Sequence, residues 1–214
     1  ERVRYIDWMP VFNAWEFAGK FPDLLTDPVV GDAASNLYAD ARHALKQLIS
    51  ERWLRARAVL GIFPANAVDD DVELYADETR ERVAHRLHTL RQQKPKPAGQ
   101  PHYALADFVA PKTSGVRDWV GAFAVTAGIG LDEKVREFEA RHDDYGAIML
   151  KALADRLAEA LAERMHERVR RELWGYAPEE RNSNDQLIRE DYRWGSNRYR
   201  GVEINGELVA YAIY

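Results

Sequence analysis

The residues best suited to chemistry in this sequence are histidines and acids that lie close together along the chain. His166-Glu167 begins like the zinc motif His-Glu-X-X-His, in which two histidines one helical turn apart bind the metal. Position 170 is Arg, so the second metal ligand is missing, and we interpret the pair as part of a solvated helix face. A metal could also be bound by His85, His88 and His102, but nothing in their spacing sets a coordination geometry. We therefore favour the interpretation that these histidines are not metal ligands.

Other short patterns are also better explained by structure than by catalysis. His142-Asp143-Asp144 could form a ligand or acid–base cluster, but such a run more often caps or borders helices, and we favour that interpretation. Gly128-Ile129-Gly130 lacks the third glycine of a dinucleotide-binding loop and indicates a turn. The sequence contains neither a GxxxxGK[ST] phosphate loop nor a GxSxG nucleophile turn. Spacing alone therefore predicts no catalytic residue and no metal site.

Composition narrows the class of protein. The 214 residues contain 30 basic and 35 acidic side chains, and the net charge of -5 argues against a nucleic-acid surface. The absence of cysteine excludes disulfides, zinc–thiolate sites, iron–sulfur clusters and a cysteine nucleophile, and fits a reducing compartment. No apolar run approaches the roughly 20 residues that cross a bilayer, and the N-terminus lacks a signal-peptide core. We expect a cytoplasmic domain cut from a longer chain, with no membrane partner.

Apolar periodicity predicts the elements of the first two thirds of the chain. Residues 32–53 have the spacing of an amphipathic helix. Residues 57–64 and 119–126 resemble buried strands, the first ended by Pro64, and residues 71–75 alternate as a strand that could pair with it. Residues 79–90 fit either a helix or a strand. Three prolines and a glycine make residues 93–101 a loop, and Pro10 favours an extended segment over residues 5–10.

The last third begins with a long helical pattern and ends with a hairpin. Residues 131–174 are helical, with an apolar face that includes Ile148, and Gly146 marks either a break or a close contact. Ser183 can cap a short helix that continues to Arg189. Residues 202–204 and 208–213 flank Asn205-Gly206, a pair that favours a type I′ turn. The fold class is therefore α+β, with long helices packed around a mainly antiparallel twisted sheet that ends in a β-hairpin.

Beyond these patterns, many segments are similar, in order and spacing, to one family. The resemblance runs from about residue 5 to 192, and so many ordered segments make it specific. The matching segments include Tyr5-Ile6-Asp7-Trp8-Met9-Pro10, Gly61-Ile62-Phe63-Pro64-Ala65-Asn66, Asp77-Glu78-Thr79-Arg80, His142-Asp143-Asp144-Tyr145, residues 151–160 and Trp174-Gly175-Tyr176-Ala177-Pro178. The chain resembles the reactivation domain of cobalamin-dependent methionine synthase, which also implies the fold expected above.

The resemblance implies a function in methionine biosynthesis. Domains of this family bind S-adenosylmethionine and present its methyl group for the reductive methylation of inactive cob(II)alamin. A neighbouring domain of the same enzyme holds the cobalamin, and flavodoxin or an equivalent reductase supplies the electron. The resemblance thus implies part of a methyltransferase that acts by positioning, because holding a methyl donor in line replaces a bimolecular encounter.

Three acids match family positions near the cofactor. Asp7 matches an aspartate that binds S-adenosylmethionine, and its carboxylate suits the ammonium group through a charge-assisted hydrogen bond. Glu159 and Glu190 match glutamates near the cofactor. Without the resemblance, all three would be interpreted as turn, cap or solvated helix residues.

The end of the chain departs from the family. After Tyr192 the family continues with an Arg-Pro-Ala-Pro-Gly-Tyr-Pro segment whose arginine binds the cofactor carboxylate, and that segment is missing here. Arg193, Arg198 or Arg200 could supply a replacement guanidinium or remain surface charges. We expect residues 1–192 to form the family-like domain and residues 193–214 to form a hairpin that completes its sheet. Two alternatives stay open: a truncated or redesigned scaffold with weak or no cofactor binding, and, less favoured, an independent hydrolase or metalloenzyme.

Overall fold

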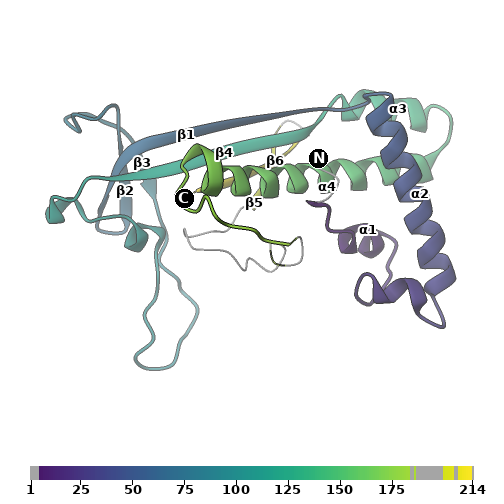
Figure 1. Cartoon of the computed structure of the whole chain (residues 1–214), viewed down its shortest axis with the longest axis horizontal. Helices are drawn as coiled ribbons and strands as arrows, with labels where there is room; N and C mark the ends of the chain where they lie inside the picture. The colour runs from purple at the N-terminus through teal and green to yellow at the C-terminus, as the bar shows by residue number, and fades with distance from the viewer. Residues whose placement is uncertain (1–4, 184–185, 187–199, 205–206, 214) are drawn as a thin grey trace. The chain divides into compact units, whose positions relative to one another are not determined.

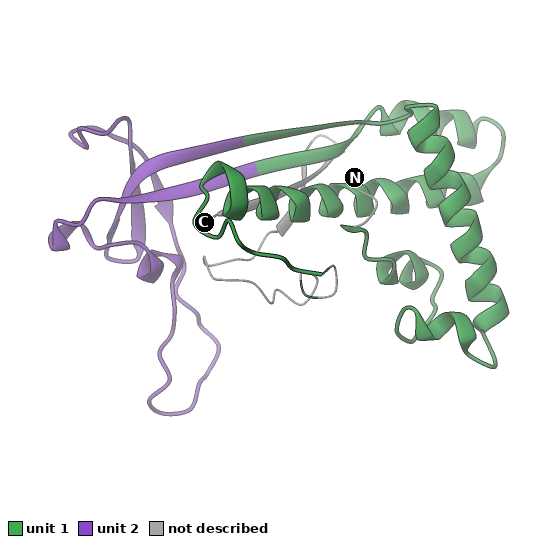
Figure 2. Ribbon diagram, in the orientation of Figure 1, with its two compact units in different colours: residues 1–59, 124–193, 199–211 green, residues 60–123, 194–198, 212–214 purple. Residues whose placement is uncertain are grey.

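The structure, a computed structural model, describes residues 5–183, 186, 200–204 and 207–213, the last two ranges by their backbone alone. The chain divides into two compact units (Figure 2). Unit 1 comprises residues 1–59, 124–193 and 199–211, and unit 2 comprises residues 60–123, 194–198 and 212–214. Each unit is described separately below.

Unit 1 contains the long helices (Figure 1). Helices α1, α2 and α3 each pack against α4, which continues directly into a π-helical turn, η5. Their bounds are α1 Met9–Ala14, η2 Asp23–Thr26, α2 Gly31–Ser50, α3 Leu131–Glu139, α4 Asp144–Arg168 and η5 Val169–Leu173. The helix α2 predicted over residues 32–53 is confirmed, with buried Leu37, Ala41, Leu45 and Leu48 spaced three or four residues apart on its inner face.

The start of unit 1 differs from the extended segment that we predicted. Helix α1 begins at Met9, with Pro10 in its first turn. Proline is compatible with that place because the amide hydrogens of the first turn have no partner within the helix. Val11 and Phe12 of α1 are buried in the unit 1 core with Trp8 and Leu153.

The long helical pattern divides at residues 140–143 rather than at Gly146. Asp143 caps α4, because its Oδ1 accepts a hydrogen bond from the Gly146 amide at 2.8 Å. A Cβ on Gly146 would lie 2.6 Å from both Asp143 Oδ2 and a ring carbon of Phe138, so any other residue would require these side chains to move. The close-contact alternative and the capping interpretation of Asp143 are therefore correct. Ile148 is 48% exposed, so its predicted place on the buried face is wrong.

The sheet has six strands in the order β3-β2-β1-β4-β6-β5. Antiparallel pairing joins β1 to β2, β2 to β3 and β5 to β6, which confirms the α+β class. The bounds are β1 Arg55–Val68, β2 Asp71–Tyr75, β3 Val83–His88, β4 Asp118–Ile129, β5 Arg200–Ile204 and β6 Glu207–Ile213. Residues 83–88 thus form a strand, which resolves the ambiguity of residues 79–90.

Strand β1 does not end at Pro64 as predicted. It continues to Val68, and its pairing with β2 starts only at Ala65, opposite Leu74. Pro64 has no amide hydrogen to donate. It precedes the first residue of β1 that pairs with β2, so the pairing of β1 with β2 loses no hydrogen bond.

Unit 2 has a small core and several charged loops. Its buried cluster comprises Ala65, Ala67, Val72, Leu74, Ala106 and Val120. Arg91 joins two loops by ion pairs to Asp70 and Asp107, with nitrogen–oxygen distances of 2.6 and 2.7 Å. Residues 93–101 form the predicted loop, and the short apolar stretch after it is a 3-10 turn, Leu105–Phe108.

The predicted C-terminal hairpin is confirmed as a β5–β6 pair, with Val202 opposite Val209. Its Asn205-Gly206 turn lies outside the described residues. In the sheet β6 neighbours β4, so the hairpin extends that edge. Ser183 Oγ accepts a hydrogen bond from the Gln186 amide at 3.3 Å, which supports the predicted cap, and the rest of that helix lies outside the described residues. Among the residues that are described, no helix is long and apolar enough to cross a membrane.

Candidate functional site

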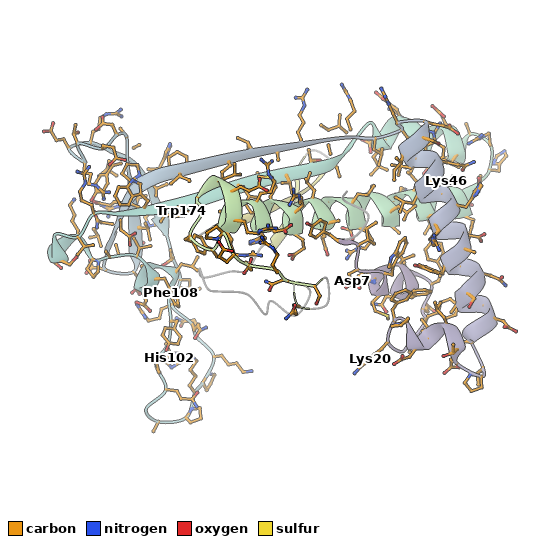
Figure 3. All side chains as sticks on the ribbon, in the orientation of Figure 1. Asp7, Lys20, Lys46, His102, Phe108 and Trp174 are labelled. Atoms are coloured by element: carbon orange, nitrogen blue, oxygen red, sulfur yellow. The ribbon has the colours of Figure 1, made fainter. Side chains whose placement is uncertain are left out.

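Asp7 is held in one orientation at the start of α1 (Figure 3). Its Oδ1 accepts a hydrogen bond from the Met9 amide at 3.0 Å, and the side chain is half-buried. This is the turn-type contact expected of an aspartate without a cofactor role. It involves one carboxylate oxygen, and among the described residues Oδ2 has no hydrogen-bond donor. A carboxylate fixed in this way can still bind a cation.

Helix α4 carries three glutamates at intervals of four residues, which places them along one face. We call Glu159, Glu163 and Glu167 the acidic stripe. The middle glutamate of the stripe is the most buried. The Glu159 side chain is 38% exposed, Glu163 is 5% exposed and the Glu167 side chain is 13% exposed. Carboxylates this well buried require cationic or hydrogen-bonding partners.

Glu159 is fixed by a buried arginine one turn earlier. Arg156 donates from Nη1 and Nη2 to the two oxygens of Glu159, at 2.8 and 2.9 Å, in the bidentate geometry that a guanidinium favours. Burial lowers the pKa of Arg156, but Asp155 and Glu159 outweigh this effect and raise it. The Glu159 carboxylate is therefore held in place by Arg156, whose single positive charge it shares with Asp155.

Glu167 joins the segment before Asp7 to α4. Tyr5 Oη donates to its Oε2, Arg164 Nη1 donates to the same oxygen at 2.8 Å, and Arg171 Nη1 donates to Oε1 at 2.6 Å. Burial raises the pKa of Glu167, but the hydrogen bonds from Tyr5, Arg171 and Arg164 together lower it to about 2. Because Tyr5 lies two residues before Asp7, this anion restrains the chain that carries Asp7.

The end of α4 contains further buried charge. Arg170 is fully buried within the π-helical turn, and its Nε donates to Glu180 Oε2 at 2.7 Å. His166 is also fully buried, and this burial, with the nearby Arg170 charge, lowers its pKa to about 3. Our interpretation of His166-Glu167 as a solvated face is therefore wrong. π-Helical turns of this kind are frequent at functional sites.

The predicted site residues divide into those whose side chains the structure describes and those whose side chains it does not describe. Asp7 and Glu159 both belong to unit 1. Glu167, which binds Tyr5, is eight residues from Glu159, or about 12 Å along the helix. The side chains of Glu190, Arg193 and Arg198 lie outside the described residues, and Arg200 is described only as backbone in β5. Asp7 and Glu159 therefore lie in the same unit, and their role in the site, like that of the expected guanidinium, stays a prediction.

The histidines considered for a metal site are dispersed. His85 and His88 lie on β3, where both are exposed, and His88 Nδ1 is 3.0 Å from Asp71 Oδ2. His102 contacts the Gln92 carbonyl through its Nδ1 at 2.8 Å. Within the part of the chain that the structure describes, no three His, Cys, Asp or Glu residues are grouped so as to hold a metal ion.

Sequence reasoning missed four residues of this site: Arg156, Glu163, Glu167 and Arg170. Charges three or four residues apart, such as Glu163 and Glu167 or Glu167 and Arg170, are visible in the sequence but are equally typical of ion pairs on a solvated helix. A buried charged cluster is distinguished from a solvated helix face by its partners. These partners, Tyr5 and Glu180, lie on other segments of the chain. One signal in the sequence could have found these residues. The helix carries many charged residues although alanine or leucine occurs on every turn.

Comparison with known proteins identifies the family. A sequence model of the family described as vitamin B12 dependent methionine synthase, activation domain, matches residues 1–199. This chain belongs to that family. A crystal structure described as the MetH reactivation domain bound to AdoHcy superposes with a TM-score of 0.90 at 44% sequence identity, covering 99% of this chain and 74% of the other. The domain boundary that we expected after Tyr192 stays a prediction.

Proposed function

We propose that this chain binds S-adenosylmethionine in unit 1 and presents its methyl group to cobalamin held by a neighbouring domain of the same enzyme. The observation that carries the proposal is the fixed Asp7 carboxylate, two residues after Tyr5, which donates to Glu167 of α4. On that helix arginines orient Glu159 and Glu167. The 44% identical reactivation domain that was crystallised with AdoHcy, the demethylated form of this cofactor, supports the same ligand class.

The described residues suit the cationic parts of this cofactor. S-adenosylmethionine carries an ammonium and a sulfonium, and Asp7 and Glu159 are carboxylates in the same unit. The ammonium would bind Asp7 by a charge-assisted hydrogen bond, which is stronger than a neutral one. Glu159, already bound to Arg156, would contribute negative potential more than a new hydrogen bond. The cofactor carboxylate requires a cation, for which Glu190 is unsuitable and Arg193, Arg198 or Arg200 are the candidates.

The role of the protein would be to position the donor. The bound cofactor supplies the methyl group in reductive methylation, and flavodoxin or an equivalent cytoplasmic reductase supplies the electron. The residues of this chain would hold the two ends of the donor, orient it and restrict its motion, which is a sufficient source of rate enhancement for a transfer between bound partners. No proton transfer by Asp7 or Glu159 is required.

A second candidate is a scaffold that keeps the fold but binds the cofactor weakly or not at all. One observation favours it: the sequence after Tyr192 reads Arg193-Trp194-Gly195, without the arginine–proline segment that the resemblance implies. Under this alternative the tail would complete the sheet, next to β4, without restoring the cofactor carboxylate site.

Isothermal titration with S-adenosylmethionine separates the two candidates. We expect saturable binding by the full chain and an affinity about tenfold or more lower for Asp7→Asn, because the charged hydrogen bond becomes neutral. Asp107→Asn, the same chemical change in unit 2, is the matched control and should bind as the unaltered chain does. Failure of the unaltered chain to bind would support the scaffold, and equal binding by Asp7→Asn would remove Asp7 from the site.

A further inference from the structure

The short segment that carries Asp7 is buried on both sides of that residue. Before it, Tyr5 and Ile6 are 4% and 3% exposed, and after it Trp8 is 9% exposed. These three side chains belong to the core of unit 1, whereas Asp7 is only half-buried. Asp7 is therefore the residue of this segment that solvent, and a dissolved ligand, can reach.

Two kinds of contact fix the Asp7 carboxylate, and they do different things. The hydrogen bond from the Met9 amide to Oδ1 spans two residues, so it sets the direction of the carboxylate relative to its own backbone. It does not set where that backbone lies in the fold. A contact across the fold does this: the Tyr5 hydroxyl donates to Glu167 Oε2 on α4, 162 residues further along the chain.

The segment is joined to the same helix at its other end. Helix α1 begins two residues after Asp7 and packs against α4. Its Val11 and Phe12 are buried in the core cluster that also contains Leu153 of α4. Helix α4 is therefore a common support for the chain before Asp7 and for the chain after it.

Glu167 is well suited to hold the Tyr5 hydroxyl. Arg164 and Arg171, one helical turn before and after it, donate to its two oxygens at 2.8 and 2.6 Å. Despite burial, which raises the pKa of Glu167, the hydrogen bonds from Tyr5, Arg171 and Arg164 lower it to about 2. The carboxylate therefore stays ionised at neutral pH, and an ionised acceptor forms a stronger hydrogen bond than a neutral one.

We propose that Tyr5 and Glu167 are positioning residues for the cofactor: their hydrogen bond holds Asp7 where its Oδ2 meets the ammonium group of S-adenosylmethionine. This inference deepens the proposed function and rests on it. Neither Tyr5 nor Glu167 touches the ligand. Both act through Asp7, because a hydrogen bond weakens steeply as its distance and angle leave their favoured range. A displacement of about 1 Å in a positioning group is enough to lose much of its effect.

The test is isothermal titration of S-adenosylmethionine into the full chain and its Tyr5→Phe variant. Phenylalanine keeps the buried ring, and Glu167 keeps both arginines, so we expect the fold to be retained. Affinity should fall about fivefold, the size of one lost hydrogen bond. Tyr145→Phe is the matched control, because it also removes a hydroxyl that donates to a carboxylate of unit 1, Asp40 on α2, at 2.8 Å. It should bind as the unaltered chain does.

A double-variant cycle distinguishes positioning from a general loss of stability. In the Asp7→Asn background, Tyr5→Phe should lower affinity by less than about twofold, because an effect that passes through Asp7 is already lost there. The same fivefold loss in both backgrounds would show that Tyr5 acts without Asp7 and would overturn the inference. Equal losses in Tyr5→Phe and Tyr145→Phe would overturn it too.

A measurement without ligand keeps this inference separate from the proposed function. Amide hydrogen exchange at Met9, followed by NMR, reports the hydrogen bond to Asp7 Oδ1. Tyr5→Phe should speed this exchange about fivefold, and Tyr145→Phe should leave it unchanged. Unchanged exchange in Tyr5→Phe rejects the positioning role even if the unaltered chain binds S-adenosylmethionine. Failure of the unaltered chain to bind, with faster exchange in Tyr5→Phe, rejects the proposed function instead.

Discussion

Two ion-paired arginines, Arg91 in unit 2 and Arg170 in unit 1, differ in how deeply their pairs are buried. In unit 2, Arg91 joins Asp70 and Asp107, and the side chains are one third to one half exposed. In unit 1, Arg170 and Glu180 form a pair in which the side chains are 0% and 9% exposed. Solvent weakens the first kind of pair, whereas a buried pair cannot lose one partner without leaving an uncompensated charge. Burial, and not the number of charges, distinguishes the Arg170 pair from the Arg91 pairs.

The most severe test of this contrast removes a buried charge from unit 1. Arg170→Met leaves Glu180 without its guanidinium partner, and we expect the free energy of unfolding to fall by about 4 kcal/mol. Urea denaturation monitored by tryptophan fluorescence measures the change. The double variant Arg170→Met/Glu180→Leu replaces both charges with apolar groups and should recover most of the loss. If the single variant is as stable as the unaltered chain, the buried pair contributes little and the contrast fails.

A second test uses pH. The folded state lowers the pKa of His166 to about 3, through burial and then the Arg170 charge, below its ordinary value of 6.5. As pH falls below 6.5, the unfolded chain binds a proton that the folded chain excludes, so stability decreases until pH reaches about 3. At pH 5 this costs about 2 kcal/mol relative to pH 7.

The control for this test is His166→Gln, which cannot titrate. Its stability difference between pH 7 and pH 5 should be smaller than that of the unaltered chain by the same amount, whatever its absolute stability. Identical pH dependence of the two proteins would mean that His166 is not kept neutral in the folded state.

The smallest effect is expected in unit 2. Asp107 has its pKa lowered to about 2, first by Arg91 and then by the Ala104 amide. Asp107→Asn keeps an oxygen that can accept from the Ala104 amide, and Arg91 keeps Asp70. We expect a loss below about 1 kcal/mol in urea denaturation at pH 7. A loss as large as that of Arg170→Met would show that exposure does not decide what these two ion pairs contribute to stability.

The sequence was informative where local physics decides structure. The spacing of Leu37, Ala41, Leu45 and Leu48 predicts α2, and the Asn-Gly pair predicts the β5–β6 hairpin. The run His142-Asp143-Asp144 is typical of a helix cap or border, and Asp143 does cap α4. Each depends on a few neighbouring residues, so a reading along the chain suffices.

What could not be predicted depends on contacts between distant segments. Glu167 would be an ordinary exposed acid of a helix if Tyr5, 162 residues away, did not donate to it. Arg170 is buried because the turn before Glu180 folds back over the helix end. Pro64 is tolerated in β1 because β2 pairs only beyond it. Asp7 and Glu159 stay predictions for the cofactor site, and only the family resemblance indicated them.

The most direct measurement is a crystal structure of this chain soaked with AdoHcy at saturating concentration. The account predicts density in unit 1, with the amino group of the ligand within hydrogen-bond distance of Asp7 and its body near the acidic stripe of α4. Density elsewhere, or an Asp7 carboxylate that stays with the Met9 amide and touches no ligand, would contradict it.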